Sequence, residues 1–149
     1  MKNNKNNSAL IFVNADAKGE ILVCDEGLSF WGGIDPNTAK IIDVHHPNYG
    51  EVVAGKIVLM PSSRGSCSGS GVLLELALKG IAPAALIFLE AEDILTLGAI
   101  ISDRLFNLPI ATLRLKTSVY QELSQAKEAE IKNSVLHFCD KSVPLFKPN

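Results

Sequence analysis

The chain lacks several features on which large classes of proteins depend. It has 3 cysteines, Cys24, Cys67 and Cys139, in 149 residues, and none stands in a CxxC pair. An odd number of scattered cysteines argues against a disulfide scaffold and against a zinc site. No apolar run reaches the roughly 18 residues that a membrane span needs. We therefore expect reduced thiols, no metal bound by this chain and no membrane partner.

Two further shortages narrow the choice of partner and compartment. The formal net charge is −2, so no basic surplus is available to neutralise phosphates, and nucleic acid is excluded as a partner. The apolar run after the first lysines breaks at Asn14 and Asp16, which is too early for a signal peptide. We expect a cytoplasmic protein.

What the chain does have is enough apolar material for one core. Hydrophobic residues make up 47% and charged residues 20% of the sequence, which is typical of a single globular domain of this length. Residues 1–8 are polar and are expected to be disordered, whereas residues 9–149 contain no linker long enough to separate two domains. We predict one domain.

Hydrophobic periodicity and turn residues predict the elements. The glycine-rich stretch 29–38 is expected to form a loop and a turn, and the sequence DAKG (16–19) a turn between the first two strands. Ser118 and Gln121 fit a capping box, and residues 94, 97, 101 and 105 form an apolar helical stripe. The expected strands are 9–15, 19–25, 39–43, 56–60, 84–89, 110–115 and 134–138, and the expected helices are 72–79, 93–106 and about 119–130. The fold class is therefore α/β, with a β-rich first third followed by alternating strands and helices on a parallel sheet.

The sequence PSSRGSCSGSG (61–71) lies between a buried strand and a helix that is apolar nearly all round and expected to be buried. Ligands of α/β proteins bind at this position, at the carboxyl end of a strand. Unpaired amides at a helix N-terminus favour an anion, glycines allow close approach, and Arg64 can grip a carboxylate or a phosphate. We call residues 61–68 the serine loop and expect it to face an anion.

Other interpretations of this loop exist. A Walker P-loop requires a lysine that is absent. The sequence GSCSG nearly matches a nucleophile elbow, but only His137 follows as a late histidine and no acid partner is evident. A plain solvent loop remains open, as does a serine acting as a proton base, which would need Arg64 and the loop amides to stabilise its alkoxide.

Three other stretches contain residues that could take part in a site. Gly32 and Gly33, with Asp35 orienting a ligand, form either a ligand-facing loop or a packed corner in which Asp35 bonds its own turn. The adjacent His45 and His46 point to different sides and favour a polar loop with one packed histidine over a metal site. The acidic run EAED (90–93) is expected to complement the dipole of the following helix.

Three stretches together resemble the aconitase X swivel domain, the small-subunit component of aconitase X enzymes. They are LSFWGGIDPNTAKIIDVHHPNYGE, GKIVLMPSSRGSCSGSGVLLEL and APAALIFLEAEDILTLGAIISDRLFNLPI, and the resemblance covers about residues 9–115. It implies a swivelling β/β/α domain. It also implies a dehydratase of hydroxy acids whose large catalytic partner, a separate chain or a fused domain, binds an iron–sulfur cluster, so that no cofactor is expected on this chain alone.

The resemblance also assigns roles. Aligned through RGS, Ser66 falls on the serine that accepts the proton, and Arg64 would bind the substrate acid group or stabilise the alkoxide. The sequence PSSR is also similar to the serine–arginine signature of the ordinary aconitases, which keeps Ser62 and Ser63 as alternative bases. The expected substrate-binding residues are Ser62, Ser63, Gly65, Cys67, Gly32, Gly33 and Asp35.

Two activities of the family compete for this chain. The form SSRGSCSGSGVLLEL is closer to the bacterial type, cis-3-hydroxy-L-proline dehydratase, than to archaeal phosphomevalonate dehydratase. The resemblance therefore favours a small hydroxy acid as substrate and a heterodimer with a large aconitase X subunit. A free-standing anion-binding or regulatory module is the alternative from another class.

Overall fold

The structure is a computed structural model that describes residues 8–149. Its elements build one mixed sheet of eight strands in the order β1-β5-β4-β3-β2-β6-β7-β8. The strands are β1 (Ala9–Val13), β2 (Ala17–Val23), β3 (Ile57–Met60), β4 (Ala85–Phe88), β5 (Ala111–Leu115), β6 (Glu128–Lys132), β7 (Val135–Phe138) and β8 (Lys141–Pro144). The helices are α1 (Phe30–Gly33), α2 (Gly69–Leu78), α3 (Ile94–Phe106) and α4 (Thr117–Ser124).

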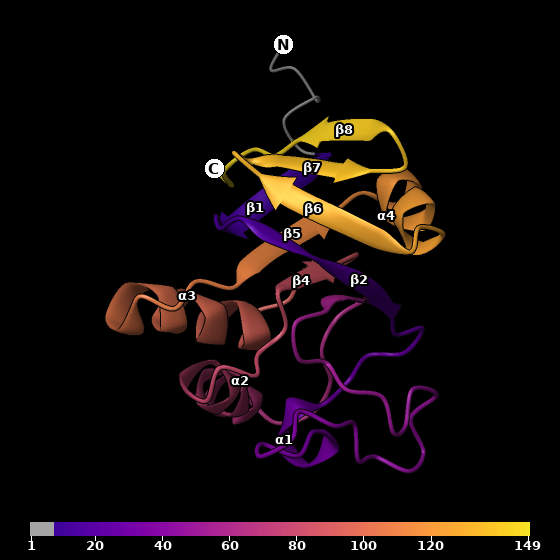
Figure 1. The fold of residues 1–149 in the computed structure, drawn as a ribbon. Coiled ribbons are helices and arrows are strands. Elements are labelled where there is room, and N and C mark those ends of the chain that lie inside the picture. The colour runs from indigo at the N-terminus through magenta and orange to yellow at the C-terminus, as the bar shows by residue number, and fades with distance from the viewer. Residues whose placement is uncertain (1–7) are drawn as a thin grey trace.

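Half of the sheet is parallel, as the alternation of strands and helices predicts. Strands β2, β3, β4 and β5 pair in parallel, with α2 and α3 as the crossovers between β3, β4 and β5. Figure 1 shows these two helices side by side below the sheet. The remaining pairs, which include the C-terminal meander β6-β7-β8, are antiparallel. The α/β fold class with a swivel-type arrangement is confirmed, but the sheet is mixed rather than parallel.

The sheet curves until its two ends nearly meet. The amide of Phe146, just beyond β8, donates to the carbonyl of Ala9 at 3.0 Å, and the amide of Ile11 donates to the carbonyl of Phe146 at 2.9 Å. Leu145 is buried beside this bridge. The strands thus form a nearly closed barrel, which leaves little of the β1 edge open to another chain.

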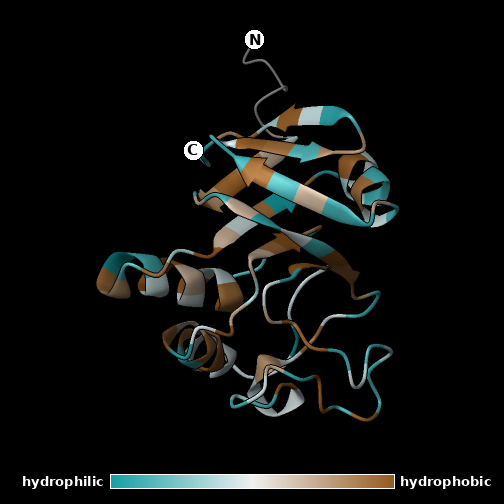
Figure 2. Ribbon diagram, in the orientation of Figure 1, coloured by the Kyte–Doolittle hydropathy of each residue, from teal (hydrophilic) through white to brown (hydrophobic). Residues whose placement is uncertain are grey.

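Alternate residues of the central strands fill two separate cores. In β3, Val58 and Met60 face the cluster that includes α2 and α3, whereas Ile57 and Leu59 face the cluster that includes Tyr120. Both sides of the strand are therefore fully apolar, which explains the uninterrupted apolar run IVLM. On β6 the burial alternates, and Figure 2 shows teal and brown bands along this strand.

Several predicted elements are wrong. The predicted turn DAKG does not form, because Ala17, Lys18 and Gly19 already belong to β2. In the sheet, β5, β4 and β3 separate β1 from β2. Residues 39–43 contribute only isolated bridges, Ile34 to Ile41 and Lys40 to Val52. The residues FWGG form a single distorted helical turn, α1, rather than a loop. The predicted disordered segment 1–8 lies outside the described residues except for Ser8, whose carbonyl accepts from the Lys116 amide.

The helix predicted over 119–130 is two elements. The helix α4 begins at Thr117 and ends at Ser124, and residues from Glu128 form strand β6. Ser118 lies inside the helix rather than at its N-cap, which is Lys116 without a side-chain capping bond. The capping-box prediction is therefore wrong.

The face that α3 buries is also not the predicted stripe. Leu97 is 52% and Leu105 is 74% exposed, whereas Gly98, Ala99 and Ser102 are buried. Small residues allow α3 to lie close to α2, so the larger side chains face outward. The expectation that α2 is buried nearly all round fails at Leu78, which is 55% exposed.

Candidate functional site

The serine loop runs from the carboxyl end of β3 to the start of α2, as predicted. The segment after β2 holds it on one side, where the Arg64 amide donates to the Leu28 carbonyl at 3.3 Å. The segment after β4 holds it on the other side, where the Glu90 amide donates to the Pro61 carbonyl at 2.9 Å. The carboxyl ends of three adjacent parallel strands therefore meet at this loop, which is where such sheets bind ligands.

The serines of the PSSRGSCSGSG sequence differ in how their hydroxyl groups are used. Ser62 Oγ donates to the Ala91 carbonyl at 3.4 Å, Ser63 Oγ donates to the Glu92 carboxylate, and Ser70 Oγ donates to the Cys67 carbonyl at 2.9 Å. Ser66 Oγ instead accepts a hydrogen bond from the Ser68 amide at 3.1 Å. Ser66 is exposed, so its own hydroxyl hydrogen is available to a ligand.

Arg64 projects from the loop with its guanidinium in solvent. Its side chain is 66% exposed, and Nη1 lies 3.6 Å from Glu26 Oε2. A Cβ atom at Gly27 would lie 2.6 Å from the Ser62 carbonyl oxygen and 2.6 Å from Arg64 Cγ, so a glycine is needed where the neighbouring segment passes the serine loop. A guanidinium has five N–H donors, and one exposed ion pair leaves most of them for a carboxylate or phosphate.

The backbone of the loop is shaped at Gly65 and offers only some of the expected amides. Gly65 has φ +85°, and a Cβ atom there would lie 2.4 Å from Ser29 Oγ, so only glycine fits. The amides of residues 69–72 donate to the carbonyls of Ser66, Cys67 and Ser68. Within residues 8–149, the Ser66 and Cys67 amides have no such acceptor. An anion could use these two amides, rather than the whole helix N-terminus.

The chain around Gly32 and Gly33, here called the glycine corner, lies partly beside the serine loop. Ser29 Oγ donates to the Trp31 carbonyl at 2.8 Å, and the Trp31 amide is 3.8 Å from the position of a Cβ atom at Gly69. Trp31 itself is 61% exposed. Gly32 has φ +78°, which favours glycine, and Gly33 is buried against Leu28. The corner therefore turns the chain next to the serine loop.

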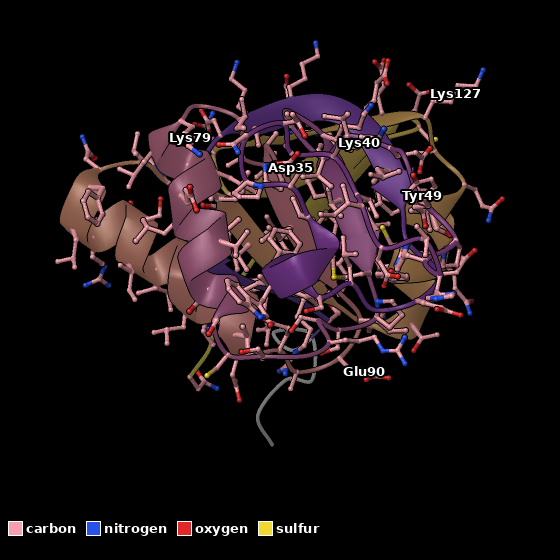
Figure 3. The ribbon with its side chains drawn as sticks, turned by 90° about the horizontal axis from the view of Figure 1, so that it is seen from below. Asp35, Lys40, Tyr49, Lys79, Glu90 and Lys127 are labelled. Carbon is pink, nitrogen blue, oxygen red and sulfur yellow. The ribbon has the colours of Figure 1, made fainter. Side chains whose placement is uncertain are left out.

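Asp35 is not brought to the serine loop. Its Oδ1 accepts from the Asn37 amide at 2.9 Å, which is the turn-forming bond considered for it above. Lys79, at the C-terminal end of α2, donates to the Pro36 carbonyl at 3.3 Å and to Asn37 Oδ1 at 2.8 Å. Figure 3 shows Asp35 and Lys79 near one another. The serine loop precedes the opposite end of α2, about 15 Å away along the helix.

The interpretation of the histidine pair as a polar loop with one packed ring is confirmed. His46 is 5% exposed, and its Nδ1 accepts from the Asn48 amide at 3.0 Å. Its Nε2 lies 3.2 Å from the Glu26 carbonyl, so the tautomer that satisfies both contacts carries the proton on Nε2. His46 thereby supports the segment that bears Glu26, the partner of Arg64.

The sequence did not predict three neighbours of the serine loop. Glu26 pairs with Arg64, Ser29 lies against Gly65, and Glu92 accepts a hydrogen bond from Ser63. They come from segments about 30 residues before and after the loop, and no local pattern links them to it. The helix-dipole interpretation of EAED is confirmed, because Glu92 accepts from the Leu95 and Thr96 amides at 2.7 and 2.9 Å.

The cysteines lie in unrelated surroundings. Cys24 is buried, whereas Cys67 in the loop and Cys139 in the β7–β8 turn are exposed. No group of three or more His, Cys, Asp and Glu among residues 8–149 could hold a metal ion, so the described residues do not fit an iron–sulfur cluster. None of the helices in this part of the chain is long and apolar enough to cross a membrane.

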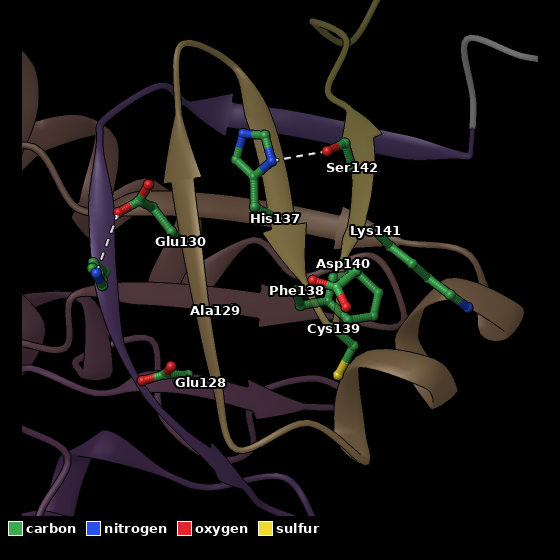
Figure 4. Close-up of a pocket in the computed structure, with 10 residues that line it drawn as sticks. Glu128, Ala129, Glu130, His137, Phe138, Cys139, Asp140, Lys141 and Ser142 are labelled. Atoms are coloured by element: carbon green, nitrogen blue, oxygen red, sulfur yellow. Dashed lines mark hydrogen bonds and ion pairs between the residues drawn. The ribbon is translucent and has the colours of Figure 1, made fainter.

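A shallow pocket occurs elsewhere, on the solvent side of β6, β7 and β8 (Figure 4). In this pocket, His137 Nδ1 lies 2.9 Å from Ser142 Oγ, and Lys18 Nζ lies 3.9 Å from Glu130 Oε2. His137 is therefore not a partner for a serine nucleophile in the serine loop, which removes the last support for a nucleophile elbow.

Several known proteins are similar to this chain. The model of the aconitase X swivel domain family matches residues 7–137. The chain is 47% identical over 116 residues to cis-3-hydroxy-L-proline dehydratase of Hypocrea jecorina, covering 78% of this chain and 20% of that protein. It is 52% identical over 103 residues to the enzyme of that name from Pseudomonas aeruginosa, covering 68% of this chain and 18% of that protein. The chain thus spans about a fifth of the length of these curated relatives.

A shorter relative and a solved structure complete the comparison. The chain is 41% identical over 101 residues to the phosphomevalonate dehydratase small subunit of Methanopyrus kandleri, covering 67% of this chain and 75% of that protein. The holo-form of aconitase X from Thermococcus kodakaraensis superimposes with a TM-score of 0.70 at 34% identity, over 83% of this chain and 88% of that one. The chain belongs to the aconitase X swivel domain family.

Proposed function

We propose that this chain is the swivel subunit of an aconitase X-type hydro-lyase that dehydrates cis-3-hydroxy-L-proline, with Ser66 as the proton acceptor. The observation that carries the proposal is the contact of Ser66 Oγ with the Ser68 amide at 3.1 Å. An N–H donor aimed at the oxygen favours the alkoxide, the form that takes a proton. Ser62 and Ser63, the alternative bases, both donate their hydroxyl hydrogens to acceptors within the protein.

In this proposal, Ser66 Oγ removes the proton α to the substrate carboxylate. The electrons of that C–H bond form the new carbon–carbon double bond as the C–O bond breaks, and the departing hydroxyl takes up one proton to leave as water. Loss of the abstracted proton from Ser66 Oγ to solvent restores the base. Arg64, whose side chain is 66% exposed, binds the carboxylate or stabilises the alkoxide. The Ser66 and Cys67 amides, which have no acceptor among the described residues, would be further donors to the substrate carboxylate.

The second half of the site lies outside this chain. The leaving hydroxyl needs an electrophile, which the resemblance assigns to an iron–sulfur cluster on a large catalytic partner. The described residues of this chain do not fit such a cluster. In the hydroxyproline dehydratases, of which this chain spans about a fifth, the partner would be part of the same polypeptide. In the relatives named as small subunits, the partner would be a separate chain.

A second candidate function is that of a phosphomevalonate dehydratase small subunit. It is supported by the 41% identity over 101 residues to the Methanopyrus kandleri protein, of which the match covers 75%. Sequence identity favours the first candidate by a small margin, at 47% and 52% against 36–46% for the phosphomevalonate dehydratase small subunits. The loop sequence SSRGSCSGSGVLLEL favours it as well.

Reconstitution tests the proposal. The purified chain and its large partner are assayed separately and together on cis-3-hydroxy-L-proline and on phosphomevalonate. We expect turnover of hydroxyproline by the mixture only. Turnover of phosphomevalonate alone would establish the second candidate. A chain that forms no complex and binds small phosphorylated ligands as a monomer would instead be a free-standing anion-binding module.

A further inference from the structure

Glu92 is a buried carboxylate with an unusual set of partners. It is only 9% exposed. Its Oε1 accepts from the Leu95 amide at 2.7 Å and from Ser63 Oγ, while its Oε2 accepts from the Thr96 amide at 2.9 Å and from Thr96 Oγ1 at 3.0 Å. Four donors and no cation surround the group within the described chain, so both oxygens of the buried carboxyl group are satisfied by hydrogen bonds.

Capping the helix does not explain the whole arrangement. The two amide bonds satisfy the N-terminus of α3, and a short side chain at the N-cap would serve for that purpose. Asp93 occupies the N-cap position and makes no capping bond. The bond from Ser63 is additional, and it crosses 29 positions of sequence to join the β4–α3 segment to the serine loop.

We propose that Glu92 is a positioning residue for the serine loop, acting through Ser63. This inference rests on the proposed function, because it concerns the orientation of Arg64 and Ser66. The Arg64 side chain starts one residue after the anchored Ser63, and the left-handed turn at Gly65 then leads to Ser66. Because the Glu92 carboxylate is held by two amides at the start of α3, it restricts the position of Ser63 more than a contact with a second loop would.

The rest of the attachment supports this role. The Leu89 and Glu90 amides both donate to the Pro61 carbonyl, at 3.2 and 2.9 Å, and Ser62 Oγ donates to the Ala91 carbonyl at 3.4 Å. These contacts hold the start of the loop, whereas the Glu92–Ser63 bond is the last one before Arg64 on this side. Its loss would release the part of the loop that faces the ligand, and small displacements of reacting groups cost up to about 100-fold in rate.

The test compares Glu92→Ala, Ser63→Ala and the double variant in the complex with the large partner. If Glu92 acts through Ser63, each single change lowers kcat about 10- to 100-fold, and the double variant is no worse than Ser63→Ala. Ser63→Thr, which keeps a hydroxyl group, restores most of the rate. The matched control is Ser102→Ala, which removes a buried hydroxyl bond to the Leu108 carbonyl at the far end of the same helix and should leave kcat unchanged.

A second measurement is independent of catalysis. Amide hydrogen exchange of residues 62–68 in the isolated full chain should quicken about tenfold or more in Ser63→Ala, and stay unchanged in Ser102→Ala. Three results would overturn the inference. The first is a loss of kcat in the double variant equal to the product of the two single losses, and the second is unchanged amide exchange in Ser63→Ala. The third is a loss of kcat in Ser102→Ala as large as that in Ser63→Ala. Ser66→Ala separates the two proposals, since an active Ser66→Ala complex contradicts the assigned base while the exchange result still decides the role of Glu92.

Discussion

Gly98 of α3 lies directly against the backbone of Ser70 in α2. A Cβ atom at Gly98 would be 2.8 Å from the Ser70 carbonyl oxygen and 3.1 Å from its Cα, so no side chain fits there without moving one helix. The closeness of the two crossover helices therefore depends on this glycine.

We predict that Gly98→Ala lowers the free energy of unfolding by about 1–3 kcal/mol, as overpacking does in other cores. Urea unfolding followed by circular dichroism measures the change. Gly71→Ala is the matched control, because a Cβ atom at Gly71 meets nothing within 4 Å and alanine favours a helix by about 1 kcal/mol. Equal stability of Gly98→Ala and the wild type would contradict the close contact.

The bridge between the C-terminal segment and β1 yields a second prediction. Leu145 is 7% exposed and belongs to the core inside the curved sheet. Leu145→Ala should cost about 2–4 kcal/mol, as for other buried leucines. Leu105→Ala removes the same atoms at a position that is 74% exposed, and should change the stability by less than about 0.5 kcal/mol. A small effect at Leu145 would mean that the sheet is not closed by this segment.

Burial of Cys24 predicts how stability depends on alkaline pH. Desolvation, followed by the charges of Glu51 and Asp25, raises the pKa of the thiol from 9.0 to about 12. Between these pH values the unfolded thiol loses its proton while the folded one keeps it, so the unfolded state binds fewer protons and stability falls as pH rises. Burial also raises the pKa of Tyr120, which acts in the same direction at higher pH.

The measurement is the free energy of unfolding between pH 8 and 11 for the wild type and Cys24→Ala. We expect a decline of about 1 kcal/mol per pH unit above pH 9 in the wild type, and a shallower one in the variant. Parallel curves would show that the Cys24 thiol does not contribute.

The turn between β7 and β8 contains only Cys139 and Asp140, with φ of +46° and +61°. A two-residue turn with both φ positive is type I′, in which glycine is favoured at the second position. Asp140→Gly should therefore raise the stability by about 1 kcal/mol. Asp103→Gly, within the helix α3, should lower it by about the same amount. A destabilised Asp140→Gly protein would argue against this turn.

The same turns explain what the sequence could not predict. Neither Asn133-Ser134 nor Cys139-Asp140 contains a glycine, so the hairpins of the C-terminal meander have weak turn signals. The predicted polar helix from residue 119 was therefore extended to residue 130, into the strand β6 that begins at Glu128. The helix–strand alternation from 56 to 115 was predictable because its strands are short, apolar and bounded by glycine or proline.

For the candidate site, the position of the serine loop was predictable and its surroundings were not. Arg64 and Ser66 follow a buried strand, and that local context is visible in the sequence. The contacts of Ser63 with Glu92 and of Gly65 with Ser29 arise only because the sheet brings three strand ends together. The long separation of Asp35 from the loop likewise depends on the course of α2.

Ser66 is the proposed proton acceptor of a site that a large partner subunit completes. The most direct measurement is kcat for cis-3-hydroxy-L-proline with Ser66→Ala and Ser68→Ala in the reconstituted complex. The second variant is the control, since it keeps the backbone amide that contacts Ser66 Oγ. We predict that Ser66→Ala lowers kcat about 1,000-fold or more with an unchanged Tm, and that Ser68→Ala stays within about threefold of the wild type. A Ser66→Ala complex with the kcat of the wild type would contradict the claim.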